Sequence, residues 1–125
     1  GYKRLYAVIR KEAIDEMRDG EHVFERVLLL EGMPNVQRLG TLSVGESVPE
    51  QFRADLALEL LAVERLNAGI THAAASGDNA TRALLESILR NEDEHIDWLE
   101  AQLTLIQQVG EANYLAQQIH NDEAN

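Results

Sequence analysis

Carboxylate and imidazole side chains interrupt the apolar positions of the segment LRNEDEHIDWLEAQL, residues 89–103. Residues three apart share one face of a helix, so Glu92 and His95 can reach one metal ion together. The chain has no cysteine, which leaves oxygen and imidazole nitrogen as ligands, and these suit iron or manganese. A single Glu-x-x-His pair is common by chance, so a metal site needs further ligands from elsewhere in the chain.

Two other segments supply such ligands. When each segment is read at alternating steps of three and four residues, the row predicted to face the core is apolar except near its middle. Glu16, Glu59 and Glu92 occupy those middle positions. Buried carboxylates without partners are costly and repel one another, whereas shared cations make them tolerable. The rows therefore predict a metal site, although any one glutamate could instead reach outward to solvent. In the first segment the row is Ile9, Ala13, Glu16, Gly20, Val23, Val27 and Leu30.

Four helices are predicted to position these side chains, in an all-α fold. Gly32 and Pro34 favour a stop after the first helix, and Gly110 favours a stop after the third. Ser47 and Glu50 have the spacing of a capping box at the start of the second. A helix of about 30 residues is about 45 Å long, so the long link can run the length of a bundle. The expected helices span 2–31, 48–75, 80–109 and 111–120, with a crossover over 32–47.

The composition restricts the class of partner. A chain of 125 residues is predicted to form one domain. Its 22 acidic and 11 basic residues give a net charge of −11, which argues against nucleic acid or an anionic membrane and suits cations. No apolar run approaches the about 18 residues of a transmembrane helix, and no signal peptide is recognisable. The expected location is the cytoplasm.

The chain resembles bacterioferritin, the haem-binding branch of the ferritin family, over essentially its whole length. The resemblance implies a ferritin-like four-helix bundle, with three long helices and a short C-terminal helix present here. The family's first helix, which carries one further glutamate ligand, is missing from the sequence, so one side of the apolar rows would be uncovered. The segments that carry the resemblance are IDEMRDGEHVFERVLLLEGMPN, LGTLSVGE, ADLALEL, ILRNEDEHIDWLE and LIQQVGEANYLAQQI.

The resemblance also implies roles for individual residues. Glu16 and Glu92 match the bridging glutamates of a di-iron ferroxidase centre. Glu59 matches a terminal carboxylate of that centre, and His95 a ring-nitrogen ligand. Met17 matches the methionine that ligates the iron of a b-type haem shared between two subunits. Asp19 stands where the family has a second histidine ligand; an aspartate can still bind iron, so Asp19 remains an additional candidate metal ligand.

The implied function is iron storage and detoxification: Fe²⁺ is oxidised at the dinuclear centre and kept as ferric mineral inside a hollow shell of 24 subunits. The shell would be a homo-oligomer or a mixed assembly, with a ferredoxin-type electron donor as a further partner. Two alternatives stay open. One is a haem-bearing subunit with a defective ferroxidase centre in a mixed shell, which Asp19 favours. The other is a structural helical bundle whose polar core residues set the register of the helices without metal chemistry.

Overall fold

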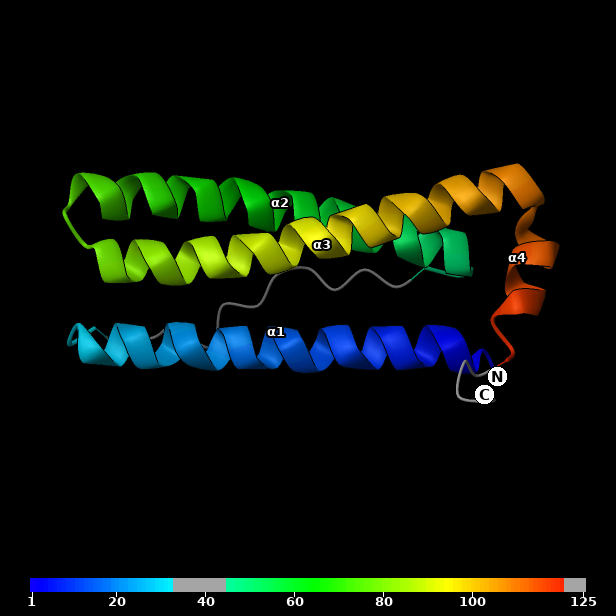
Figure 1. Cartoon of the computed structure of the whole chain (residues 1–125), viewed down its shortest axis with the longest axis horizontal. Coiled ribbons are helices and arrows are strands. Elements are labelled where there is room, and N and C mark those ends of the chain that lie inside the picture. The colour runs from blue at the N-terminus through cyan, green and yellow to red at the C-terminus, as the bar shows by residue number, and fades with distance from the viewer. Residues whose placement is uncertain (33–44, 121–125) are drawn as a thin grey trace.

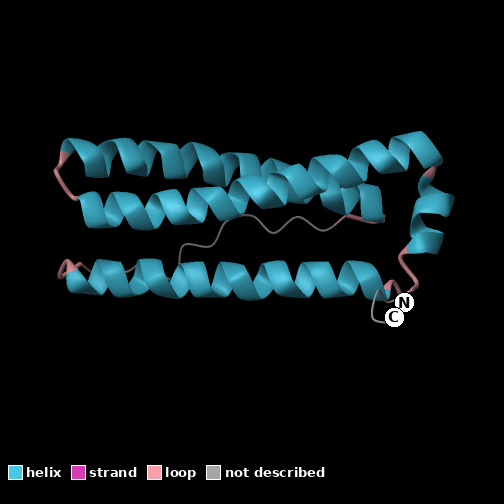
Figure 2. Ribbon diagram, viewed as in Figure 1, coloured by secondary structure: helices cyan, strands magenta, loops and turns pink. Residues whose placement is uncertain are grey.

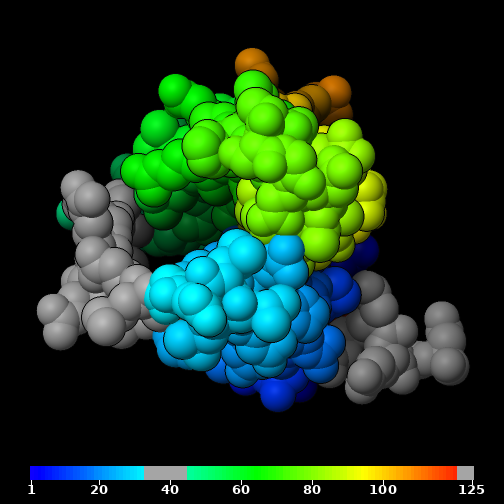
Figure 3. Space-filling model, turned by 90° about the vertical axis from the view of Figure 1, so that its left-hand side faces the viewer, coloured from blue at the N-terminus to red at the C-terminus, as the bar shows by residue number. Residues whose placement is uncertain are grey.

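The computed structural model describes residues 1–32 and 45–120, and all regular structure within them is helical (Figure 2). The four helices are α1 (Lys3–Leu29), α2 (Val48–Ala75), α3 (Asn79–Val109) and α4 (Glu111–Gln117). In Figure 1, α2 and α3 form an antiparallel pair, α1 runs alongside them, and the short α4 lies across one end. Viewed from the end opposite α4, helix α1 lies against the α2–α3 pair (Figure 3). The three long helices thus form three sides of an elongated bundle.

The helix bounds differ from the predicted ones only at the ends. α1 begins one residue later and ends two residues earlier than predicted, and α4 ends three residues earlier. Glu31 adopts a left-handed backbone conformation with φ of 61°, and the Gly32 N–H donates to the Val27 carbonyl at 2.9 Å. This turn closes the C-terminus of α1 before Gly32. The predicted crossover over 32–47 lies largely outside the described residues.

Short polar contacts fix where α2 and α3 begin. The Ser47 hydroxyl accepts a hydrogen bond from the Glu50 N–H at 3.3 Å, and the Glu50 carboxylate accepts one from the Glu46 N–H at 2.8 Å. This is the predicted capping arrangement with its return bond shifted by one residue. At the start of α3, the Asp78 carboxylate accepts from the Thr81 N–H at 3.1 Å. Both caps satisfy N–H groups that have no partner within the helix.

The same cap ties α1 to the turn between α2 and α3. Arg26, in the last turn of α1, donates from Nη2 to Asp78 Oδ1 and from Nε to Thr81 Oγ1, each at 2.9 Å. Because these bonds span more than 50 residues of sequence, they hold the C-terminal end of α1 against the rest of the bundle.

The apolar core lies near the α4 end of the molecule. Phe52 from α2, Leu99 from α3 and Tyr114 from α4 are each 1% exposed, and Leu5 from α1 is 4% exposed. The Phe52 ring meets the Trp98 and Tyr114 rings edge to face, at centroid distances of 5.5 and 6.4 Å. All four helices therefore contribute to one layer, in an arrangement that aromatic rings favour.

The predicted inward row of α1 is only partly buried. Val27 of this row is half-buried and Glu16 reaches side chains of α2 and α3, but Ile9 is 48% exposed, Val23 36% and Leu30 56%. Helix α1 packs mainly against α3, and a shift of one residue turns a helix face by about 100°. Most of the buried or half-buried positions of α1 therefore lie one step earlier, at Leu5, Val8, Glu12, Asp15, Asp19 and Arg26, and Ile14 and Val27 are half-buried beside them.

Large apolar side chains remain exposed on both α1 and α2, in line with the expected uncovered rows. They include Leu28 at 51% and Leu29 at 71% in α1, and Leu58, Leu60 and Leu61 at 43–51% in α2. Even so, no helix in the described part of the chain combines the length and apolarity needed to cross a membrane.

Candidate metal centre

Four side chains from three helices converge at mid-height in the bundle. They are Glu16 from α1, Glu59 from α2, and Glu92 and His95 from α3. Each offers one atom able to bind a metal, and these atoms all lie within 4.8 Å of one another. The four residues are the ones that the apolar rows and the Glu-x-x-His pair single out.

The apolar core fixes two of these carboxylates. Glu59 follows Phe52 by seven residues and Glu92 precedes Leu99 by seven, so each lies two turns from a fully buried core residue on the same helix face. Glu59 and Glu92 are only 8% exposed. The packing that buries Phe52 and Leu99 therefore also directs both carboxylates into the bundle.

Three polar atoms of the cluster are buried without a hydrogen-bond partner among the described residues: Oε2 of Glu59, Oε2 of Glu92 and Nδ1 of His95. Buried polar atoms in proteins are almost always satisfied, because leaving them unpaired costs free energy. A divalent cation would satisfy all three at once. Carboxylate oxygens with one imidazole nitrogen form a donor set that suits Fe²⁺, so the residues present fit such an ion.

The electrostatics of the cluster reflect its concentrated negative charge. Burial, followed by the neighbouring Glu59 carboxylate, raises the pKa of Glu16 to about 7. Glu16 is exposed along much of its length, and only its carboxyl end reaches the cluster. The Glu59 carboxylate, whose Oε1 lies 3.4 Å from His95 Nδ1, raises the pKa of His95, with further attraction from Glu12. A cation bound among these groups would favour their deprotonated forms.

The remaining predicted site residues lie outside this group. Asp19 Oδ2 accepts a hydrogen bond from Asn91 Nδ2 at 3.3 Å, at an exposed position. Asp19 lines a pocket of about 330 Å³ between α1 and α3, together with Glu12 and Glu94. Met17, the residue after Glu16, is 68% exposed. The metal role of Asp19 and the haem role of Met17 stay predictions.

Sequence reasoning missed Glu12, which also faces the cluster. Its Oε2 lies 3.8 Å from His95 Nδ1, and its side chain is 27% exposed. Glu12 precedes Glu16 by four residues and belongs to the row of α1 that packs on α3. Reading the α1 row one step earlier would have included it.

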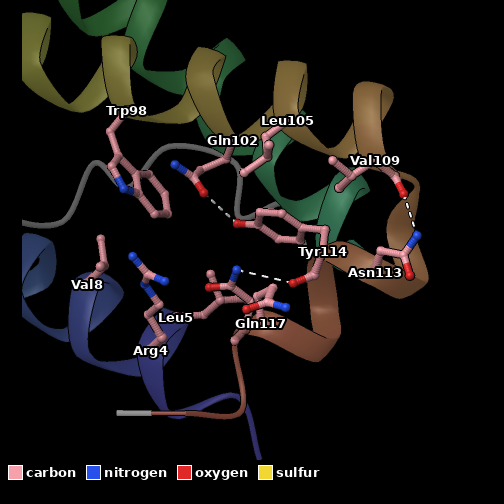
Figure 4. Close-up of a pocket in the computed structure, with 11 residues that line it drawn as sticks. Arg4, Leu5, Val8, Trp98, Gln102, Leu105, Val109, Asn113, Tyr114 and Gln117 are labelled. Carbon is pink, nitrogen blue, oxygen red and sulfur yellow. Dashed lines mark hydrogen bonds between the residues drawn. The ribbon is translucent and has the colours of Figure 1, made fainter. Parts of the chain in front are cut away.

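A second cavity, of about 420 Å³, lies at the α4 end among α1, α3 and α4 (Figure 4). Its wall includes Trp98, Leu105 and Tyr114, and the Tyr114 hydroxyl donates to Gln102 Oε1 at 2.7 Å (Figure 4). No carboxylate or histidine lines it. This cavity therefore offers no counterpart to the metal-ligating group.

Comparison with known proteins identifies relatives of this chain. A family model for the ferritin-like domain matches residues 1–109. The chain is 46% identical to bacterioferritin of Mycobacterium bovis over 117 residues, which cover 94% of this chain and 74% of the relative. It is 47% identical to bacterioferritin of Mycobacterium leprae, with the same coverage. Identity to bacterioferritin of Streptomyces coelicolor is 46% over 93% of this chain and 70% of the relative.

The helical architecture, the family match across most of the chain and the high identity to several bacterioferritins point to one assignment. The chain belongs to the bacterioferritins of the ferritin-like family.

Proposed function

We propose that this chain is an iron-storage subunit that binds Fe²⁺ at Glu16, Glu59, Glu92 and His95 and oxidises it there. Membership of the bacterioferritins supports iron storage. One observation supports the site above all others: two carboxylates that are 8% exposed each hold a buried oxygen without a hydrogen-bond partner among the described residues, and both belong to one group with an imidazole. Without a cation this arrangement is a net cost to folding.

The residues have distinct roles in this proposal. Glu16 and Glu92 bridge two Fe²⁺ ions, while Glu59 and His95 each serve as a terminal ligand. Two Fe²⁺ ions give one electron each to O₂, which takes up two protons and leaves as hydrogen peroxide. Burial weakens solvent screening, so the carboxylates favour the higher charge of Fe³⁺ more strongly than they would in water. The net charge of −11 raises the local concentration of the cation.

The assembly belongs to the same proposal. The chain would form a hollow shell of 24 subunits in the cytoplasm, and ferric mineral would accumulate inside it. Met17, 68% exposed, would offer its thioether to the iron of a b-type haem shared with a second subunit. Bound haem supplies one-electron transfer, with a ferredoxin-type protein as the donor for iron release.

A second function is favoured by the position of Asp19. Its carboxylate is hydrogen-bonded to Asn91 instead of joining the four-residue group. On this alternative the chain is a haem-bearing subunit with a weak ferroxidase centre, and a partner subunit in a mixed shell oxidises the iron.

Oxidation of Fe²⁺ by the purified chain tests both functions. Anaerobic protein is loaded with Fe²⁺ and mixed with O₂, and ferric iron is followed by its ultraviolet absorbance. The first proposal expects rapid oxidation that Glu92→Gln reduces at least tenfold. Glu100→Gln, which removes one charge from an exposed position of the same helix, is the control and should leave the rate unchanged. Oxidation at the background rate by the unmodified chain would reject the first function and favour the second.

A further inference from the structure

Glu12 lies beside the four-residue metal-ligating group, close to His95 Nδ1. Its Oε2 lies 3.8 Å from His95 Nδ1, and Glu59 Oε1 lies 3.4 Å from the same nitrogen. Donor atoms about 2.1 Å from one transition-metal ion are separated by about 3 Å when adjacent and by about 4.2 Å when opposite. Both distances fall within that range. One ion beside His95 Nδ1 can therefore contact both carboxylates.

Asp19, in contrast, is engaged elsewhere. Its Oδ2 accepts a hydrogen bond from Asn91 Nδ2 at 3.3 Å. Both aspartate and glutamate could serve as ligands, but the aspartate side chain is one carbon shorter. Glu12 and Asp19 lie seven residues apart in the same α1 row, about two turns along the helix, so they cannot substitute for each other without a movement of α1.

We propose that Glu12, and not Asp19, is the additional α1 ligand for the cation held at His95. The cluster then consists of Glu12, Glu16, Glu59, Glu92 and His95. This inference rests on the proposed function, because it concerns the same metal centre.

Partial exposure suits Glu12 to this role. Its side chain is 27% exposed while that of Glu59 is 11% exposed, and it also lines the pocket between α1 and α3. In the absence of metal, Glu12 can turn toward solvent at little cost, which limits repulsion within the cluster. A ligand of this kind adds affinity for the cation without adding a fully buried charge.

Cobalt titration separates this proposal from simpler roles. Co²⁺ is stable to oxidation by air at these ligands and reports its ligand number through visible absorption, so the readout does not depend on ferroxidase activity. Calorimetry on the intact assembly would give the stoichiometry and dissociation constants of the unmodified chain, Glu12→Gln and Asp19→Asn. We expect Glu12→Gln to raise the dissociation constant of at least one bound Co²⁺ at least tenfold and to change the visible spectrum. Asp19→Asn, the matched carboxylate-to-amide control, should stay within twofold of the unmodified chain.

Other outcomes would overturn the proposal in distinguishable ways. If Glu12 only forms an ion pair with protonated His95, Glu12→Gln would bind Co²⁺ equally or more tightly, because the competing proton is held less firmly. That result rejects the role of Glu12 and leaves the metal centre intact, provided that Glu92→Gln still abolishes binding. Loss of binding in Asp19→Asn alone would assign the ligand to Asp19. No Co²⁺ binding by the unmodified chain would reject both Glu12 and the metal centre.

Folding of the variant is checked by its melting temperature without metal. Removal of a like charge from the cluster is expected to leave that temperature unchanged or higher. If Glu12→Gln does not fold, Glu12→Asp provides the test: its shorter carboxylate should lower the affinity for Co²⁺ and change the visible spectrum, and wild-type affinity and spectrum would contradict the proposal.

Discussion

Two layers of this bundle lie two helical turns apart on the same faces of α2 and α3 and have opposite effects on folding stability. In the apolar layer, Phe52 and Leu99 are each 1% exposed. In the carboxylate layer, Glu59 and Glu92 are each 8% exposed, and each has one buried oxygen without a hydrogen-bond partner among the described residues. Similar burial therefore has different consequences. The apolar layer stabilises the fold by itself, through burial and ring contacts. The carboxylate layer opposes folding until a cation balances its charge.

The largest effect is expected in the apolar layer. Phe52→Ala would leave a cavity beside Trp98 and Tyr114, whose rings both contact Phe52. We expect the free energy of unfolding to fall by about 3–5 kcal/mol, by the same amount with and without metal. Denaturant unfolding followed by circular dichroism would measure it. A loss well below 1 kcal/mol would show that this layer is not the main source of stability.

The carboxylate layer should respond in the opposite manner. Glu92→Gln is expected to leave the metal-free chain as stable as before or more stable, since a buried charge is removed. Stabilisation by Co²⁺ should disappear; at a concentration 100 times the dissociation constant this amounts to about 2.7 kcal/mol. Thermal unfolding with and without Co²⁺ measures both quantities, and assembly should persist. Equal stabilisation of the variant and the unmodified chain would contradict the assignment.

A smaller effect is expected where the apolar layer contains its own polar contact. The Tyr114 hydroxyl donates to Gln102 Oε1 at 2.7 Å, and burial raises the pKa of Tyr114 to about 12. Tyr114→Phe removes this bond and keeps the ring, so the free energy of unfolding should fall by about 1 kcal/mol. Chemical denaturation at pH 7 gives the value. A change as large as that of Phe52→Ala would mean that the hydroxyl, and not the ring, holds α4 in place.

The smallest effect is expected at the partly buried clamp between Arg26 of α1 and the α2–α3 turn. Hydrogen bonds from Thr81, followed by the Arg26 guanidinium, lower the pKa of Asp78 below 3.8. An aspartate with a lowered pKa stabilises the folded state above its unfolded-state pKa and loses this contribution as the pH falls through its folded-state pKa. Asp78→Asn should therefore lower the melting temperature at pH 7, and the difference from the unmodified chain should vanish in acid.

The control for this clamp is Asp97→Asn, an exposed aspartate in the middle of α3 that should show little difference at either pH. A difference for Asp78→Asn that persists unchanged below the folded-state pKa would show that the cap depends on shape and not on charge.

The sequence by itself predicted much of this molecule, because the signals involved are local. Helical periodicity and the caps at Ser47 and Gly110 placed the long helices to within a few residues. The mid-row positions of Glu16, Glu59 and Glu92, with His95 three residues after Glu92, identified the four side chains that converge. Spacing along a helix is sufficient for this, since residues seven apart return to nearly the same face.

Only the tertiary structure decided which side of α1 faces α3. A change of one residue in the row turns the helix by about 100°, and periodicity alone does not distinguish two adjacent rows when both contain apolar and acidic residues. Packing against α3 left Leu5 and Glu12 more buried than Ile9. It thereby brought Glu12 beside His95 and left Asp19 bonded to Asn91. The rotation of a helix about its own axis depends on the helices packed against it, and the sequence of that helix alone does not specify them.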